Sequence, residues 1–356
     1  MDFQPSDDRR MLRDTLTRFL ADRYGFEHRN AVAYSEPYHD PGRWAEMAEL
    51  GVLHALAPEE WGGIGGAGFD IATVFEALGR ALCPEPLLGA LMAAWILGAA
   101  GAGLDSLLSG DTRYALAVDE AGGAQGIESI ATFARRNDSG WVLNGRKSVV
   151  YGGGSAARLL VAARAGEALG VFLVDSSDAE ITRYGMIDGG GAAELYCDNT
   201  PAERIVENGE SIIRDALDHG ALALCAEAVG AMDASAELLL DYLKTRKQFG
   251  RAIGEFQVLQ HRMVDLMTEI EQARSITVLA ASRMGSDGQS RTVSMAKSLI
   301  GRVAQQVAEE LIQMHGGIAM TWEYPASHYA KRLVMIDHQL GDTDHHLTKV
   351  AAEYRG

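Results

Sequence analysis

Two apolar stripes at helical spacing, both in the last third of the chain, constrain the fold more than any other feature. Apolar residues that recur every three or four positions give a helix one face that must be buried against other helices. Both stripes are long enough for the helices of a bundle. The first stripe is Val258, Leu259, Met263, Leu266, Met267 and Ile270, and the second is Val293, Ala296, Ile300, Val303, Val307, Leu311 and Met314.

Two regions of different texture precede these stripes. Residues 1–112 show helical periodicity, with Ser6 placed to cap a first helix. Residues 113–206 consist of short apolar runs separated by glycine, asparagine or aspartate, which is typical of strands. Among these runs, Asn144-Gly145 predicts a hairpin turn. We therefore predict an α+β chain with a helical domain (1–112), a β-domain (113–206) and a helical bundle (207–356).

Composition and charge exclude several classes of partner. The chain has 356 residues and a formal net charge of −17. An acidic surface repels phosphates, so we expect no nucleic-acid partner and no membrane partner. The amino terminus lacks the basic start and apolar run of a signal peptide, and no apolar run is long enough to suggest a membrane span. Three widely spaced cysteines fit neither a disulfide framework nor a zinc site, so we expect a cytoplasmic protein.

The first candidate for chemistry is the segment Thr245–Gly250, followed by Gly254–Gln257. Arg246 could clamp a phosphate with two charge-assisted hydrogen bonds, and Phe249 could cover an aromatic ring. An ordinary corner between two helices, with cations complementing the carboxyl end of the first, explains the same residues. Taken alone, the residues favour this plainer interpretation.

Two further candidates lie closer to the carboxyl terminus. In Gln313–Gly317, paired glycines after a long helix allow close backbone approach to a ligand, although a plain helix cap is the simpler interpretation. In Leu340–His346, two acids, two histidines and a threonine could bind a metal or carry a proton. Adjacent residues rarely point at one metal, so a solvated helix start is favoured there and we predict no metal site.

The combination of these segments is more specific than any one of them. The order RKQFG, GEFQ, QMHGG and GDT resembles the acyl-CoA dehydrogenase family, and the resemblance covers essentially the whole chain. It implies a helical domain, a β-barrel-like middle domain and a four-helix bundle. It also implies FAD as cofactor and an acyl-CoA thioester as substrate, whose α,β-dehydrogenation passes a hydride to the flavin. The electron acceptor would be a protein similar to electron-transfer flavoprotein.

The resemblance assigns individual residues to the cofactor. Three of them would reach the FAD of a neighbouring subunit, which implies a homo- or hetero-oligomer. The segment Gln313–Gly317 would lie along the adenosine end of that FAD. The implied cofactor residues are Arg246, Phe249, Gln257, Gln313, Met314, His315, Gly316, Gly317 and Thr343, of which the first three reach the neighbour.

The catalytic base of the family is missing at both of its usual positions. The family's Tyr-Glu-Gly-Thr segment corresponds to Leu340–Thr343, so Gly341 stands where the glutamate would be. Some members carry the base on the first helix of the bundle, and that position falls at Gly220. Glycine has no group that can abstract a proton.

The middle domain also departs from the family pattern. The family's Thr-Glu-Pro and Gly-Ser segments correspond to residues 119–125, and its Trp-Ile-Thr strand corresponds to Val149–Tyr151. Residues that would hold a flavin within this chain are therefore altered, whereas those that would reach a neighbour's FAD are kept. This asymmetry predicts one half of a heteromer. It resembles the subunit type of bacterial steroid side-chain dehydrogenases that lacks the catalytic glutamate.

Two other interpretations stay open. A self-sufficient homo-oligomer could use a displaced base, for which Asp342 is the catalytic candidate because it lies one residue from the expected position. Glu227, seven residues beyond Gly220 and about two helical turns away, is a second one. Alternatively, the chain could be a flavin-free scaffold or binding subunit.

Overall fold

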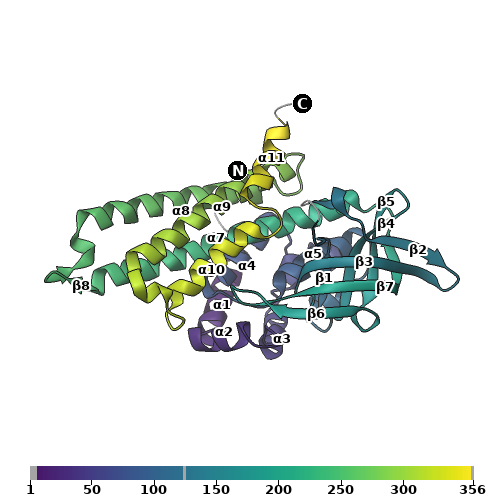
Figure 1. The fold of residues 1–356 in the computed structure, drawn as a ribbon, viewed down its shortest axis with the longest axis horizontal. Helices are drawn as coiled ribbons and strands as arrows, with labels where there is room; N and C mark the ends of the chain where they lie inside the picture. Colours follow the sequence, from purple (N-terminus) through teal and green to yellow (C-terminus); the bar gives the residue numbers. More distant parts are fainter. Residues whose placement is uncertain (1–5, 123–125, 354–356) are drawn as a thin grey trace. The chain divides into compact units, whose positions relative to one another are not determined.

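The computed structural model, drawn in Figure 1, describes residues 6–122 and 126–353. These residues divide between two compact units. Unit 1 is built from Met1–Glu27, Ile71–Cys83 and Ala221–Gly356, and unit 2 from His28–Asp70 and Pro84–Gly220.

The amino-terminal region is helical, as predicted. The first helix begins at Ser6, whose hydroxyl accepts a hydrogen bond from the backbone N–H of Arg9 at 3.3 Å. This bond satisfies one of the amide groups that have no partner within the helix. The helices of the region are α1 (Asp7–Arg23), α2 (Phe26–Ala33), α3 (Pro41–Glu49), α4 (Gly68–Ala81), α5 (Leu87–Ala99) and α6 (Asp105–Leu108), with short 3₁₀ turns η1 (His54–Leu56) and η2 (Glu59–Trp61).

The middle region forms a sheet that closes on itself. β4 pairs with β2, β2 with β3, β3 with β7, β7 with β5, and β5 again with β4, while β1 and β6 add to the outside of this ring. Closure removes free strand edges, and the predicted barrel-like domain is confirmed. The strands are β1 (Tyr114–Ala117), β2 (Phe133–Asn137), β3 (Gly140–Tyr151), β4 (Arg158–Ala165), β5 (Ala168–Asp175), β6 (Glu180–Gly185) and β7 (Gly191–Val206), with 3₁₀ turns η3 (Ile127–Ser129) and η4 (Ser176–Asp178).

The prediction of a hairpin turn at Asn144-Gly145 is wrong. Both residues lie inside β3, at a point where its register with β7 shifts. The turn between β2 and β3 lies instead at residues 138–139. Gly145 has φ +147°, and a Cβ added to it would stand 2.6 Å from the hydroxyl of Thr132. The glycine therefore serves a bulge with a close approach of two segments.

The carboxyl-terminal region is helical, as predicted, and α9 packs against α8, α10 and α11. The predicted stripe of α9, from Val293 to Met314, is buried. The elements are α7 (Glu210–Thr245), β8 (Lys247–Gln248), β9 (Arg251–Ala252), η5 (Ile253–Glu255), α8 (Gln257–Arg283), α9 (Gln289–His315), η6 (Gly316–Met320), α10 (Pro325–His338) and α11 (Thr343–Glu353).

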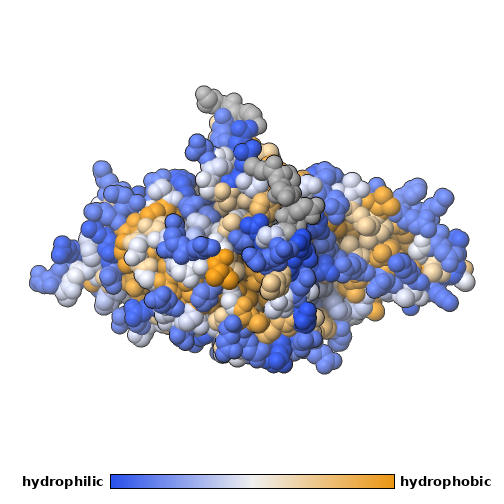
Figure 2. All heavy atoms as spheres, turned by 180° about the vertical axis from the view of Figure 1, so that it is seen from behind, coloured by the Kyte–Doolittle hydropathy of each residue, from blue (hydrophilic) through white to orange (hydrophobic). Residues whose placement is uncertain are grey.

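The predicted stripe of α8 is only partly buried. Met263, Leu266 and Ile270 lie in the core, whereas Val258 is 65% exposed and Met267 50% exposed. Apolar residues also gather in patches on the face of the molecule drawn in Figure 2. Exposed apolar surface of this kind marks contacts with other molecules. Within the described residues, no helix combines the length and hydropathy that crossing a bilayer requires.

Candidate functional site

The first predicted cofactor segment forms an exposed hairpin between α7 and α8. β8 and β9 pair antiparallel, with Gln248 opposite Arg251. Phe249 (φ +53°) and Gly250 (φ +80°) make the turn, and two successive positive φ angles are typical of a tight hairpin turn. The Phe249 side chain is 91% exposed. The hairpin thus holds a large aromatic ring away from the core of its own chain, where a ligand or partner can reach it.

The hairpin and the end of α7 before it are positively charged, although the chain as a whole is acidic. Lys244, Arg246, Lys247 and Arg251 are all exposed. The Arg251 guanidinium lies 4.1 Å from the centroid of the Phe256 ring, within cation–π range. The Arg246 guanidinium has no hydrogen-bond or ion-pair partner among the described residues. Arg246 is therefore free to bind an external anion.

The second predicted segment lies at the same end of the bundle. His315 lies at the end of α9, and Tyr242 lies on α7, one turn before Arg246. The centroids of the two rings are 4.6 Å apart. Gln313, Gly316 and Gly317 are exposed, whereas Met314 and His315 are buried. His315 donates from Nδ1 to the Leu311 carbonyl at 2.8 Å, and burial lowers its pKa. Met314 and His315 thus pack beneath the surface that Gln313, Gly316 and Gly317 form.

These groups fit the pyrophosphate and adenine of FAD. A guanidinium and a side-chain amide are donors that bind phosphate oxygens, whereas the Gly316 N–H already donates to the Ile312 carbonyl at the end of α9. A Cβ added at Gly316 or Gly317 would meet no other heavy atom within 4 Å, so the backbone there is open to a ligand. Gln257, the first residue of α8, is exposed beside the hairpin.

Thr343 lies well away from this group. Its hydroxyl donates to Asp337 Oδ1 at 2.7 Å, and a Cβ added at Gly301 on α9 would come within 2.2 Å of the Thr343 hydroxyl. Gly301 and His315 are 14 residues apart on α9. This separation corresponds to about 21 Å along the helix axis, at ~1.5 Å per residue. Thr343 and Arg246 would therefore not meet the same part of one cofactor. Thr343 would meet either a different part of that cofactor or a second cofactor molecule.

Gly341, which the resemblance places at the family's glutamate position, has little room for a side chain. Gly341 has φ +95°, and a Cβ added to it would stand 2.6 Å from His345 Cδ2 and 2.8 Å from His346 Nε2. The His346 ring is held in place, because Nε2 donates to the Leu340 carbonyl at 3.0 Å and Nδ1 accepts from the Ser294 hydroxyl at 3.2 Å. Burial lowers the pKa of His346 to about 3, so the ring is neutral.

A buried lysine that the sequence analysis missed holds the same turn. Lys297 is 0% exposed and donates to the carbonyls of Ile336, Asp337 and Gly341 at 2.8, 3.0 and 2.9 Å. Burial lowers its pKa to about 8. One signal could have found it: Lys297 falls within the apolar stripe of α9, where a charged residue must find partners in the core.

We expect that Gly341→Glu does not create a working base. The positive φ and the two histidine contacts should lower the free energy of unfolding by about 1–2 kcal/mol, the usual cost of a strained backbone residue. Urea denaturation of the purified protein measures this. Gly103→Glu is the control, because a Cβ there meets nothing within 4 Å. A Gly341→Glu protein as stable as its parent and active on an acyl-CoA would contradict the expectation.

The two displaced candidates for the base are engaged in the fold. Asp342 accepts a hydrogen bond from the backbone N–H of His345 at 2.8 Å and so caps the start of α11. Glu227 is 6% exposed and binds Arg332 through both oxygens, at 2.6 Å to Nε and 2.7 Å to the terminal nitrogen. The geometry therefore favours neither carboxylate as a base.

Glu120, in the altered middle-domain segment, is a structural anchor. It accepts hydrogen bonds from the buried Lys147 Nζ at 2.7 Å and from the backbone N–H groups of Ala131 and Thr132 at 2.8 and 2.9 Å. Although burial raises its pKa, these bonds lower the pKa of Glu120 to about 2.

Residues 123–125 of the same segment lie outside the described residues. Val149 has φ +50°, rare for a β-branched residue, at the bulge of β3.

Comparison with known protein families matches two domain models. Residues 6–103 match the model of the acyl-CoA dehydrogenase N-terminal domain, and residues 207–354 match that of the acyl-CoA dehydrogenase C-terminal domain. A relative from Mycobacterium tuberculosis, acyl-CoA dehydrogenase IpdE2, is 32% identical over 331 residues, which cover 92% of this chain and 91% of the relative.

Two solved structures are similar over nearly the whole chain. A variant of the Tcur3481–Tcur3483 steroid acyl-CoA dehydrogenase has a TM-score of 0.90 at 27% identity and covers 98% of both chains. The ChsE4–ChsE5 complex from Mycobacterium tuberculosis has a TM-score of 0.90 at 24% identity and covers 100% of this chain and 99% of the other. The second likeness supports the fold alone.

Proposed function

Because this chain belongs to the acyl-CoA dehydrogenase family, we propose that it is the base-less subunit of a heteromeric, FAD-dependent acyl-CoA dehydrogenase. The family reaction is an oxidoreduction at CH–CH groups, the α,β-dehydrogenation of an acyl-CoA thioester. The observation that carries the proposal is the turn at Gly341. It stands at the glutamate's position in a conformation and packing that leave no room for a side chain.

Residues 246–252, which include the β8–β9 hairpin, are the part of this chain that would serve the cofactor. Bound FAD supplies the hydride acceptor of the reaction. Arg246 would hold its pyrophosphate through charge-assisted hydrogen bonds, and Phe249 would cover its adenine. Gln257, Gln313, Gly316 and Gly317 complete the adenosine end. The Arg246 guanidinium has no partner among the described residues of its own chain, and the neighbouring Phe249 ring is exposed. Both features support a cofactor that is held mainly by another subunit.

The exposed face of α8 is the surface on which a partner subunit packs. Val264 and Met267, three positions apart on one face of this helix, are 61% and 50% exposed. Permanent interfaces of this kind bury more than about 2,000 Å² and are more apolar than the rest of a surface.

One similar solved structure, the Tcur3481–Tcur3483 steroid acyl-CoA dehydrogenase variant, joins two named components, which supports a heteromer with an acyl-CoA dehydrogenase homologue. It is described as a steroid acyl-CoA dehydrogenase, which favours an acyl-CoA with a steroid-type acyl group as substrate. The electron acceptor is a protein similar to electron-transfer flavoprotein.

Co-expression tests the proposal. We expect the chain purified alone to be colourless and inactive. Purified with an acyl-CoA dehydrogenase homologue that carries the glutamate, it should form a yellow complex with activity on an acyl-CoA. FAD per chain and the mass by light scattering are the measurements. Stoichiometric FAD and turnover in the chain alone would overturn the proposal in favour of a displaced base. A stable complex without flavin would overturn it in favour of a scaffold.

A further inference from the structure

The β8–β9 hairpin carries different residues on its two faces. Gln248 lies directly opposite Arg251. The ladder continues by one position, because the Arg246 carbonyl accepts a hydrogen bond from the Ile253 N–H at 2.9 Å. Residues two apart on a strand share a face, so Arg246, Gln248 and Arg251 lie on one face of the hairpin. Lys247 lies on the other face.

The two arginines of this face are close enough to meet one ligand. Arg246 is the diagonal neighbour of Arg251 across the hairpin. Diagonal neighbours stand about 7–8 Å apart, within reach of long side chains. Among the described residues, neither guanidinium has a carboxylate within 4.0 Å, whereas the next arginine of the bundle, Arg262, binds Glu310 at 2.8 Å. Two like charges on one face repel each other unless an anion lies between them.

The ring of Phe256 holds the Arg251 side chain in place. The guanidinium carbon lies 4.1 Å from the ring centroid. The Phe249 ring meets the same ring at an interplanar angle of 88°, with the centroids 6.2 Å apart. An arginine over an aromatic face keeps the N–H groups at its edge available to an anion. Phe256 is thus a positioning residue that ties Arg251 to the exposed ring at the hairpin turn.

The base of the hairpin is fixed to the bundle. A Cβ added at Gly254 would stand 2.9 Å from the Leu243 carbonyl oxygen, so the chain after β9 lies directly on the α7 backbone. The Gln260 side-chain amide donates to the Gly254 carbonyl at 2.9 Å. A hairpin that is held in this way orders its arginines before a ligand arrives, which lowers the entropic cost of binding.

From this arrangement we propose that Arg251 is a second anion-binding arginine of the cofactor site, and that it selects the adenosine diphosphate part of FAD over a nucleotide with one phosphate. Two guanidiniums on one face match two adjacent phosphate groups, each of which carries a negative charge. From residue 244 to residue 254 the sequence holds four cations and no acid, so nothing within this segment neutralises them. This role rests on the function proposed above, in which the hairpin meets the FAD.

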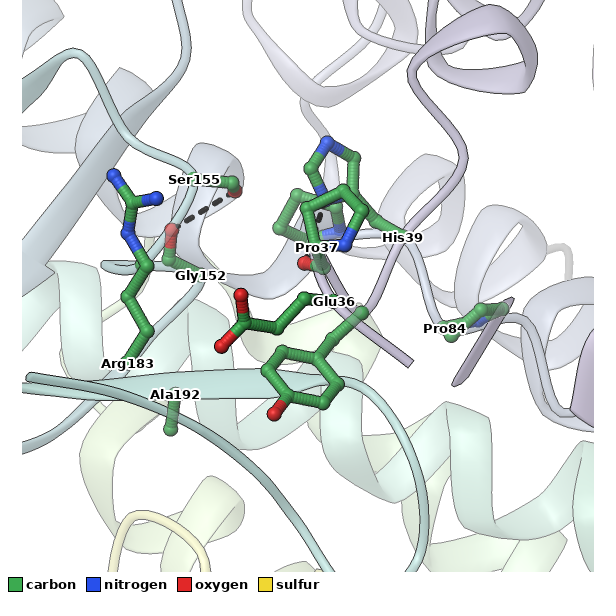
Figure 3. A pocket seen from close by; sticks show the side chains of 12 residues that line it. Glu36, Pro37, His39, Pro84, Gly152, Ser155, Arg183 and Ala192 are labelled. Carbon is green, nitrogen blue, oxygen red and sulfur yellow. Dashed lines mark hydrogen bonds between the residues drawn. The ribbon is translucent and has the colours of Figure 1, made fainter. Parts of the chain in front are cut away.

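A cavity in unit 2 does not compete for a diphosphate. It is drawn in Figure 3, has a volume of about 250 Å³ and is lined by Glu36 as well as Arg183. A carboxylate in the lining repels phosphate oxygens, and the volume lies below the usual range of ligand sites. We therefore expect an adenosine diphosphate to bind at the hairpin and not in this cavity.

Titration of the full chain with ADP-ribose, followed by ligand-observed NMR, tests the role of Arg251. ADP-ribose carries the adenine and the diphosphate of FAD without the flavin ring. We expect a Kd of about 1 mM or tighter, and roughly tenfold weaker binding of AMP. Arg246→Gln and Arg251→Gln should each weaken ADP-ribose binding roughly tenfold and narrow its advantage over AMP, because each removes a charged contact to one phosphate. Both side chains are exposed, so folding should be unaffected, which circular dichroism checks.

Lys247→Gln is the matched comparison, because it removes one positive charge from the opposite face of the same hairpin. It should weaken ADP-ribose binding less than about threefold, as expected for an exposed charge that makes no direct contact. Equal losses in all three variants would show general charge attraction and would overturn the role of Arg251. A loss for Arg246→Gln alone would overturn it too, but would leave the proposed function standing.

Absence of ADP-ribose binding by the parent chain would also overturn the role of Arg251, whereas the FAD content of the co-purified complex decides the proposed function separately. Phe256→Leu tests the positioning role. It should weaken ADP-ribose binding in the parent chain but add no further loss to Arg251→Gln, because the ring acts through the guanidinium. Additive losses of the two substitutions would overturn the positioning role of Phe256.

Discussion

Glu227→Gln should lower the free energy of unfolding by about 3–5 kcal/mol, the usual cost of leaving one charge of a buried pair without its partner. Glu227 and Arg332 are 8% and 13% exposed in their side chains, and both carboxylate oxygens bind the guanidinium. The substitution leaves a buried guanidinium that no longer faces a charge. Urea denaturation of the purified chain measures the loss.

Two controls separate this effect from a general one. Glu237→Gln removes a pair with Arg80 in which the glutamate is 65% exposed, and should change stability by about 0–1 kcal/mol. Replacing Glu227 and Arg332 together with Met should recover most of the loss, since no lone charge is then buried. The catalytic interpretation of Glu227 predicts the reverse: unchanged stability and lost turnover. That result would restore Glu227 as a candidate base.

Arg246→Ala should weaken FAD binding roughly tenfold to hundredfold, which corresponds to about 1.5–3 kcal/mol for a lost charged hydrogen bond. Folding should be unaffected, because the side chain is exposed and has no partner within the described residues. FAD per chain, in the protein alone and in the co-purified complex, is the measurement. Arg246→Lys should recover only part of the affinity, because a point charge cannot reproduce the planar fork of the guanidinium.

The control for Arg246 is Arg136→Ala, which removes an exposed arginine from β2. It should leave the flavin content unchanged. If Arg246→Ala also leaves the flavin content unchanged in both preparations, the hairpin is an ordinary corner between α7 and α8. The main physical reason for treating it as a cofactor segment would then be gone.

The order of the elements could be read from local sequence. Helical periodicity, Ser6 as a cap and short apolar runs depend on near neighbours only, and the helices and the barrel follow them. The corner between two helices at Thr245–Gly250 was also found from sequence, because a helix end, basic residues and a glycine are local signals, whereas the β8–β9 hairpin that forms this corner was not predicted. Asn144-Gly145 shows where local signals fail to predict the structure. The same dipeptide forms a bulge inside β3, where Gly145 lies close against Thr132.

The partners of buried charges were decided by the tertiary structure alone. Glu227 and Arg332 are 105 positions apart, and Lys297 reaches carbonyls 39 to 44 positions away. Which charge meets which group depends on how helices pack, and no short-range pattern encodes that packing. The sequence by itself determined that residue 341 is glycine and carries no base. Only the fold decided that its backbone angle and two histidines leave no space for one.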